Sequence, residues 1–302
     1  MSILVGLHHV TRYDYDRPVS LGPQVVRLRP APHCRHHIAN YSLGVKPAQH
    51  FVNWQQDPYG NWLARFVFGK QTGKLSVTVD LLADLAAVNP FDFFVEPYAD
   101  TWPLTFPPDL RLDLAPFLET EPAGARLKEL VRSIGREKRN TVDFIVVLNR
   151  RLHRMIRYVA RLDAGVQTPE ETLASASGSC RDTAWLLVQV LRHVGLPARF
   201  VSGYLIQLSP DVNPPKGEAA AEPDSAELHA WAEVYLPGAG WIGLDATSGL
   251  LCAEGHLPLA AAPHYRSVAP ITGTVEPCQV GFSYDISVQR IAASGGPARP
   301  ST

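Results

Sequence analysis

The chain has 302 residues, of which 46% are hydrophobic and 19% are charged, so it can build packed cores and lacks the composition of a disordered protein. Its formal net charge is -1, which disfavours general nucleic-acid and membrane-surface binders, because these present a net basic face to phosphate groups. The first residues carry no signal-peptide pattern, and no run approaches the roughly 20 apolar residues of a transmembrane helix. We therefore expect a cytoplasmic protein of about two domains, without a nucleic-acid or membrane partner.

Residues 1–110 are predicted to form an N-terminal β-rich domain. Short runs alternate apolar and polar residues, and turn-forming residues separate these runs. The expected strands cover residues 10–15, 24–28, 62–68 and 75–82. This pattern favours an antiparallel, sandwich-like domain, and we interpret the Pro- and aromatic-rich residues 97–116 as a linker.

Residues 111–290 are predicted to form a second, α+β domain, followed by a flexible tail over 291–302. Helical spacing predicts one apolar helix face from residues within 123–161, namely Phe144, Val147, Leu148, Leu152, Met155 and Ile156. A second helix follows Cys180 and ends at Gly195. Strands are expected over 199–208, 229–236 and 241–246, with an exposed loop over 210–225.

Cys180 is the candidate nucleophile, because it follows a Ser- and Gly-rich segment and opens the predicted helix. The N–H groups and dipole of a helix N-terminus stabilise a thiolate, which is the reactive form of cysteine. The same N–H groups can hold the oxyanion of a tetrahedral intermediate. Gly178 is predicted to let a substrate approach the sulfur closely.

His229 and Asp245 are the candidate base and orienting carboxylate. Each lies on one strand of a predicted hairpin that turns at residues 237–240, so the two side chains can meet. A nucleophile, a base and a carboxylate that fixes the base are the parts that acyl transfer requires.

Three blocks in order resemble the transglutaminase-like core. They are the residues 178–185, the residues 195–204, and the residues 229–235 with 240–245. Residues 1–100, which begin with the run His8 to Tyr15, resemble the β-rich N-terminal region of bacterial members. The resemblance implies a papain-like α+β core, with helices packed on an antiparallel sheet, and with Cys180, His229 and Asp245 as a catalytic triad. It implies no cofactor.

The chain departs from the animal members of that family in two ways. They place an oxyanion-stabilising Trp some tens of residues before the Cys, whereas residues 103–184 contain no Trp here. The acidic clusters of their calcium sites are also missing. Some bacterial relatives carry a large C-terminal extension, so this chain either stands alone or lacks that part, and it can belong to a larger assembly.

The function predicted from these residues is cleavage of a peptide or amide bond through a thioester on Cys180, with a peptide or protein as substrate. Hydrolysis is favoured, while acyl transfer to an amine and a non-catalytic binding scaffold remain open alternatives.

Trp231 and Tyr204 are further candidates for substrate binding, although core packing is the stronger interpretation of the Trp. The tract His33, Cys34, His36 and His37 has metal-binding residue types but no second ligand pair, so no metal is predicted.

Overall fold

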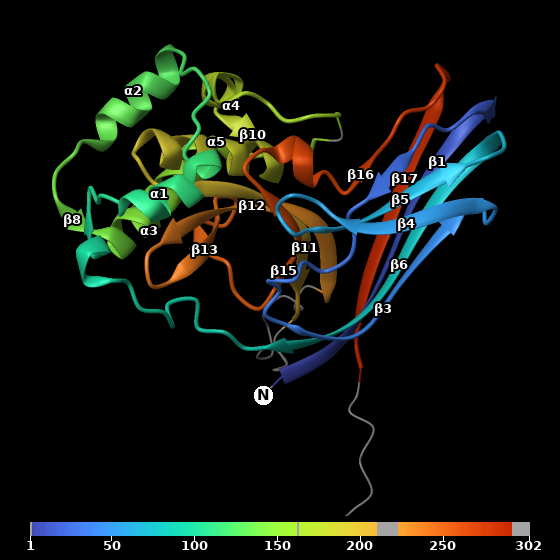
Figure 1. The fold of residues 1–302 in the computed structure, drawn as a ribbon, viewed down its shortest axis with the longest axis horizontal. Helices are drawn as coiled ribbons and strands as arrows, with labels where there is room; N and C mark the ends of the chain where they lie inside the picture. The colour runs from blue at the N-terminus through green and yellow to red at the C-terminus, as the bar shows by residue number, and fades with distance from the viewer. Residues whose placement is uncertain (1, 162, 210–222, 292–302) are drawn as a thin grey trace, which may run out of the picture.

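The computed structural model describes residues 2–161, 163–209 and 223–291, and it has the predicted α+β architecture with antiparallel sheets. Figure 1 shows the helices gathered on one side of the molecule and the long N-terminal strands on the other, with β11, β12 and β15 between them. The predicted loop over 210–225 and the predicted tail over 291–302 fall almost entirely outside the described residues. Within the described part, no helix has the length and apolar character needed to cross a membrane.

The N-terminal part consists of two four-stranded sheets that enclose one core. The first sheet has the order β17 (Val280–Arg290), β1 (Ser2–Val19), β6 (Thr72–Ala86) and β3 (His37–Lys46). The second has the order β16 (Ile271–Thr272), β2 (Gln24–Val26), β5 (Trp62–Phe68) and β4 (His50–Gln56). Alternate side chains of β6 are buried between the sheets, as the two-residue period of a strand requires, namely Leu75, Val77, Val79, Leu81, Ala83 and Leu85.

The second part is a five-stranded sheet with helices on one face. Its order is β14 (Leu250–Leu251), β13 (Gly240–Asp245), β12 (Ser225–Leu236), β11 (Ala198–Gln207) and β15 (His256–Ala262). The described helices are α1 (Pro108–Asp113), α2 (Ala125–Ile134), α3 (Thr141–Met155), α4 (Pro169–Ser175) and α5 (Cys180–His193). Short 3-10 helices lie at η1 (Pro97–Ala99), η2 (Ala115–Phe117) and η3 (Tyr265–Val268). Two small sheets pair β7 (Thr101–Trp102) with β8 (Arg139–Asn140), and β9 (Arg157–Tyr158) with β10 (Ser177–Gly178).

Helix α5 lies at the centre of the second core. Eleven of its residues are buried, which is far more than the single apolar stripe that the sequence predicted. The helix ends as expected at Gly195, whose φ of +88° suits a residue without a side chain.

Three sequence-based predictions need correction here. The strand β17 pairs with β1 over Val5 to Tyr15, so residues 280–290 complete the N-terminal sheet rather than the second domain. The predicted linker 97–116 is part of the second core, because Trp102 is buried and stacks on Phe144 with 3.9 Å between ring centroids. On the predicted apolar face of α3, Val147 and Met155 are exposed, while the other members of that face are buried.

The two parts share a buried polar contact. The hydroxyl of Tyr204 on β11 lies 2.7 Å from Nδ1 of His9 on β1, and Nε2 of His9 lies 2.8 Å from the hydroxyl of Thr11. Burial lowers the pKa of His9 to about 4 and raises that of Tyr204 well above 10.0, so both side chains are neutral at pH 7. A neutral imidazole has one N–H donor and one acceptor nitrogen, and the two hydroxyls satisfy both.

Replacing Tyr204 with Phe is expected to lower the free energy of unfolding by about 1–3 kcal/mol, because Nδ1 of His9 loses its hydrogen-bond partner in a buried place. Urea unfolding measures this change. The matched control is Tyr98→Phe, since Tyr98 is half-exposed and should change stability by no more than about 0.5 kcal/mol. Equal effects of the two changes would show that the contact contributes nothing.

Candidate active site

The first residue of α5 is Cys180, and a buried network fixes the position of this helix start. The carboxylate of Asp182 accepts hydrogen bonds from the backbone N–H and the hydroxyl of Ser179, which caps the helix. It also accepts two bonds from Arg161, at 3.0 and 3.1 Å, and one from the N–H of Gln167. Burial opposes the charge of Asp182, but these partners lower its pKa, so the carboxylate stays ionised. The network therefore ties Arg161 and Gln167 to the helix start that carries the thiol.

Gly178 has a packing role that differs from the predicted one. The residue is buried, and an added Cβ would lie 2.9 Å from Cβ of Asp182 and 3.4 Å from Cγ2 of Thr172. Its missing side chain makes room for the capping network rather than for a substrate. In the short β9–β10 sheet, Gly178 lies opposite Tyr158, and the N–H of Val159 donates to the carbonyl of Gly178 at 3.0 Å.

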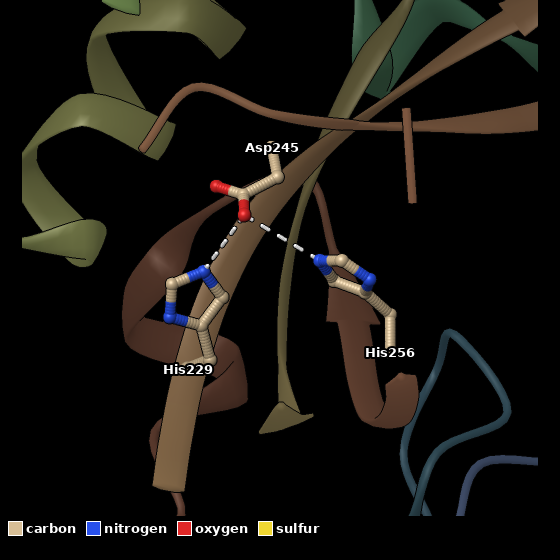
Figure 2. Close-up of side chains that lie close together, drawn as sticks. All are labelled: His229, Asp245 and His256. Atoms are coloured by element: carbon tan, nitrogen blue, oxygen red, sulfur yellow. Dashed lines mark ion pairs between the residues drawn. The ribbon is translucent and has the colours of Figure 1, made fainter. Parts of the chain in front are cut away.

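His229 and Asp245 meet as the hairpin of β12 and β13 predicts. Nε2 of the imidazole lies 3.3 Å from Oδ2 of the carboxylate, and both side chains are 2% exposed. The other oxygen, Oδ1, accepts hydrogen bonds from the N–H and the hydroxyl of Thr247, at 2.8 and 2.6 Å. Figure 2 shows the ring of His229 facing this carboxylate. Because Nε2 faces Asp245, Nδ1 is the nitrogen left for the thiol.

The charges in this pair support one another. Burial disfavours the imidazolium, but the side chains of Asp245, Cys180 and Glu227 raise the pKa of His229 far above 6.5. Burial likewise disfavours the carboxylate, but His229, His256 and Thr247 lower the pKa of Asp245 below 3.8. The site therefore holds a buried, paired imidazolium and carboxylate close to Cys180.

Two half-exposed side chains lie at the mouth of the site. Tyr158 is 48% exposed and is near enough to Cys180, His229 and Glu227 for their charges to affect its pKa, which burial raises. Oε1 of Glu227 lies 3.5 Å from Nδ1 of His229, and its side chain is 51% exposed. Neither residue was predicted from the sequence, although Glu227 shares a strand face with His229 by the two-residue period.

The other predicted substrate-binding residues, Trp231 and Tyr204, are buried at 1% and 0% exposure. Neither presents a surface to a substrate that arrives from solvent. Trp231 instead packs against the ring of His229, at 6.5 Å between centroids. Tyr204 lies at the contact with the N-terminal sheet described above.

A histidine that the sequence did not single out joins the pair. Nε2 of His256 lies 3.5 Å from Oδ2 of Asp245, and Figure 2 shows the carboxylate between the two rings. The three side chains His229, Asp245 and His256 have donor atoms within 4.8 Å of one another. Within residues 2–161, 163–209 and 223–291, they are the one such group of three or more His, Cys, Asp or Glu side chains. The tract from His33 to His37, which has metal-binding residue types but was not predicted to bind a metal, forms no such group there.

Comparisons with known proteins match both parts of the chain. The profile of the bacterial transglutaminase-like N-terminal region matches residues 5–84, and that of the transglutaminase-like superfamily matches residues 128–246. The second match contains Cys180, His229 and Asp245.

Similar full-length proteins come from mycobacteria. Uncharacterized protein Rv2569c of Mycobacterium tuberculosis is 26% identical over 295 residues, which covers 95% of this chain and 92% of that protein. Uncharacterized protein ML0607 of Mycobacterium leprae is 24% identical, with 88% and 90% covered.

Among solved structures, a protein from Cytophaga hutchinsonii named as a "putative cysteine protease" superposes with a TM-score of 0.66 at 17% identity. The superposition covers 98% of this chain and 93% of that one. The two chains therefore share a fold through both parts.

Asp245→Asn is expected to lower the pKa of His229, because burial then acts on the imidazolium without the partner that opposes it most strongly. NMR titration of the His229 ring measures this pKa, and Asp285→Asn, at an exposed strand position, is the control. A ring that titrates at the same pH in both variants would contradict the pairing.

The same pair predicts a stability profile. The raised pKa of His229 stabilises the fold below pH 6.5, and this contribution disappears as the pH rises through the raised value. The lowered pKa of Asp245 stabilises the fold above pH 3.8, and this contribution disappears as the pH falls through the lowered value. The difference in free energy of unfolding between the wild type and Asp245→Asn, measured by urea unfolding, should therefore be greatest between about pH 3.8 and pH 6.5.

Proposed function

We propose that this chain, a member of the transglutaminase-like superfamily, is an enzyme whose Cys180 thiolate attacks peptide or amide carbonyls. The observation that carries the proposal is the placement of a partly exposed thiol at a fixed helix start, beside a buried histidine that an ionised carboxylate holds. These are the parts of a covalent acyl-transfer site.

The first half of the reaction follows from these positions. The thiolate sulfur of Cys180 bonds to the carbonyl carbon, and the electron pair of the C=O π bond moves to the oxygen. The imidazolium of His229 carries a proton on Nδ1 and is stabilised by Asp245 at Nε2. It then gives its proton to the leaving amine as the C–N bond breaks, which leaves a thioester on Cys180.

Backbone N–H groups are the proposed oxyanion donors. The Trp that precedes Cys180 most closely in the sequence is Trp102. It cannot stabilise the oxyanion, because it is buried and its Nε1–H donates to the carbonyl of Val194. The N–H of Cys180 lies in the first turn of α5, where N–H groups have no partner within the helix. It is therefore the first candidate to hold the developing negative charge.

The second half of the reaction transfers the acyl group from Cys180 to water or to an amine. We propose a peptide or protein as the substrate and hydrolysis as the main outcome, and the name given to the Cytophaga hutchinsonii protein supports this proposal. His229 would then take a proton from the attacking water.

Incubation of the protein with a library of peptide amides and esters is expected to give a covalent acyl adduct on Cys180, detected by intact mass and peptide mapping. Cys180→Ala should form no adduct, because the nucleophilic sulfur is gone. The matched control, Cys278→Ala, changes a partly exposed thiol far from α5 in the sequence and should react like the wild type. An adduct that survives Cys180→Ala would exclude the mechanism.

A second candidate function, acyl transfer to an amine, is favoured by Glu227. Its half-exposed carboxylate lies beside the nitrogen of His229 that faces the thiol, where an acceptor must arrive. Within the described residues its ion-pair partner is His229, so one side remains open to a cationic amine.

Glu227→Gln is expected to reduce the ratio of amide product to acid product about 1.4- to 5-fold with cadaverine as acceptor, since a half-exposed charge pair contributes about 0.2–1 kcal/mol. Both products form from one thioester, so the ratio is independent of the acylation rate. Hydroxylamine, which is uncharged at neutral pH, should show an unchanged ratio. Equal ratios for cadaverine in the two proteins would exclude an ammonium site at Glu227.

A further inference from the structure

The carboxylate of Asp245 has more donors than a triad requires. Thr247 supplies two donors to Oδ1, while His229 and His256 both face Oδ2, at 3.3 and 3.5 Å. His256 comes from β15, which lies three strands away from β13 in the sheet order. Its side chain is 12% exposed, so solvent hardly competes for it.

The tautomer of His256 follows from its other ring nitrogen. The backbone N–H of Ala253 donates to Nδ1 at 3.3 Å, so Nδ1 is an acceptor. A neutral imidazole with an acceptor at Nδ1 carries its proton on Nε2. Nε2 therefore carries a proton 3.5 Å from Oδ2 of Asp245, within ion-pair distance, and this buried atom makes no hydrogen bond to any described residue.

The sheet is built to let His256 reach this place. Trp231 packs against both histidines, with its ring centroid 6.5 Å from that of His229 and 5.2 Å from that of His256. An added Cβ at Gly203 would lie 2.4 Å from Cη2 of Trp231 and 2.4 Å from the carbonyl of Leu257. At Gly243, an added Cβ would meet the side chain of Cys252 at 2.6 Å. The two strands that flank β12 thus each have a glycine beside Trp231, which are Gly203 on β11 and Gly243 on β13.

We propose that His256 is a positioning residue, whose Nε2–H holds Oδ2 of Asp245 in the orientation that directs His229 towards Cys180. The inference rests on the proposed function of that triad. His256 also draws negative charge away from the oxygen that faces His229. Without His256, the carboxylate would stabilise the imidazolium of His229 more strongly, so Nδ1–H would become a weaker acid and its proton would pass more slowly to the leaving amine.

The test compares two substitutions of the same residue. His256→Phe keeps a ring against Trp231 but removes the donor, whereas His256→Gln keeps an N–H at the distance of Nε2. For His256→Phe we expect kcat for an amide substrate to fall about 10- to 100-fold, by analogy with the partners that orient metal-binding histidines. KM should stay within about 2-fold, and His256→Gln should recover most of the loss.

A second readout separates positioning from mere packing. NMR titration of the His229 ring should move to higher pH in His256→Phe and stay near the wild type in His256→Gln. Besides Asp245 and His229, His36 is a titratable group next to His256, since it hydrogen-bonds the backbone there, and its resonance is followed as well. An unmoved His229 titration in His256→Phe would overturn the proposal, as would equal losses of kcat in both variants.

The titration remains informative if the enzyme proposal is wrong. A wild type that forms no acyl adduct removes the proposed function, while the response of His229 to His256→Phe still reports whether Nε2–H acts on Asp245.

Discussion

A buried negative charge governs the organisation of this site. The Asp245 carboxylate is 2% exposed, and an ionised group in such a place is unfavourable unless donors surround it. Two imidazoles and one threonine supply those donors. The backbone around the carboxylate has to bring three segments together, which are β12, the turn after β13 and the start of β15. The Asp245 carboxylate therefore constrains where these strands begin and end. Through its contact with His229, it also constrains the position of the imidazole beside the Cys180 thiol.

The central sheet has to satisfy different partners on its two faces. Ala230, Ala232 and Val234 of β12 face the buried helix α5, whereas His229 and Trp231 alternate with them along the strand and face the other way. Tyr204 and Ile206 of β11 pack into the core of the N-terminal sheets. A one-residue shift of β12 would turn His229 away from Asp245 and bury it against α5. Strand register is thus a requirement of the chemistry as much as of the fold.

Much of this arrangement was predictable from the chain alone. The position of Cys180 at a helix start, the hairpin that joins His229 to Asp245, and the α+β fold follow from local patterns and from the family motif. The missed features are long-range. His256 opens a short apolar strand with no motif around it, and only the order of the sheet brings it to Asp245. The strand β17 has an exposed, mixed pattern, so nothing local indicates that its partner is β1. Trp231 and Tyr204 have residue types common in binding sites, and burial rather than identity decides their role.

The pairing of β1 with β17 has a consequence for biosynthesis. Val5 pairs with Arg290, so one side of the first strand stays open until nearly the last described residue has been made. A ribosome releases the N-terminal sheet first, but that sheet cannot be completed before the helical part has emerged. Until then the edge of β1 presents unpaired backbone groups, which are prone to join other strands. The nascent chain thus depends on its own downstream end, and a ribosome that stalls late would leave a β-rich product with an open edge.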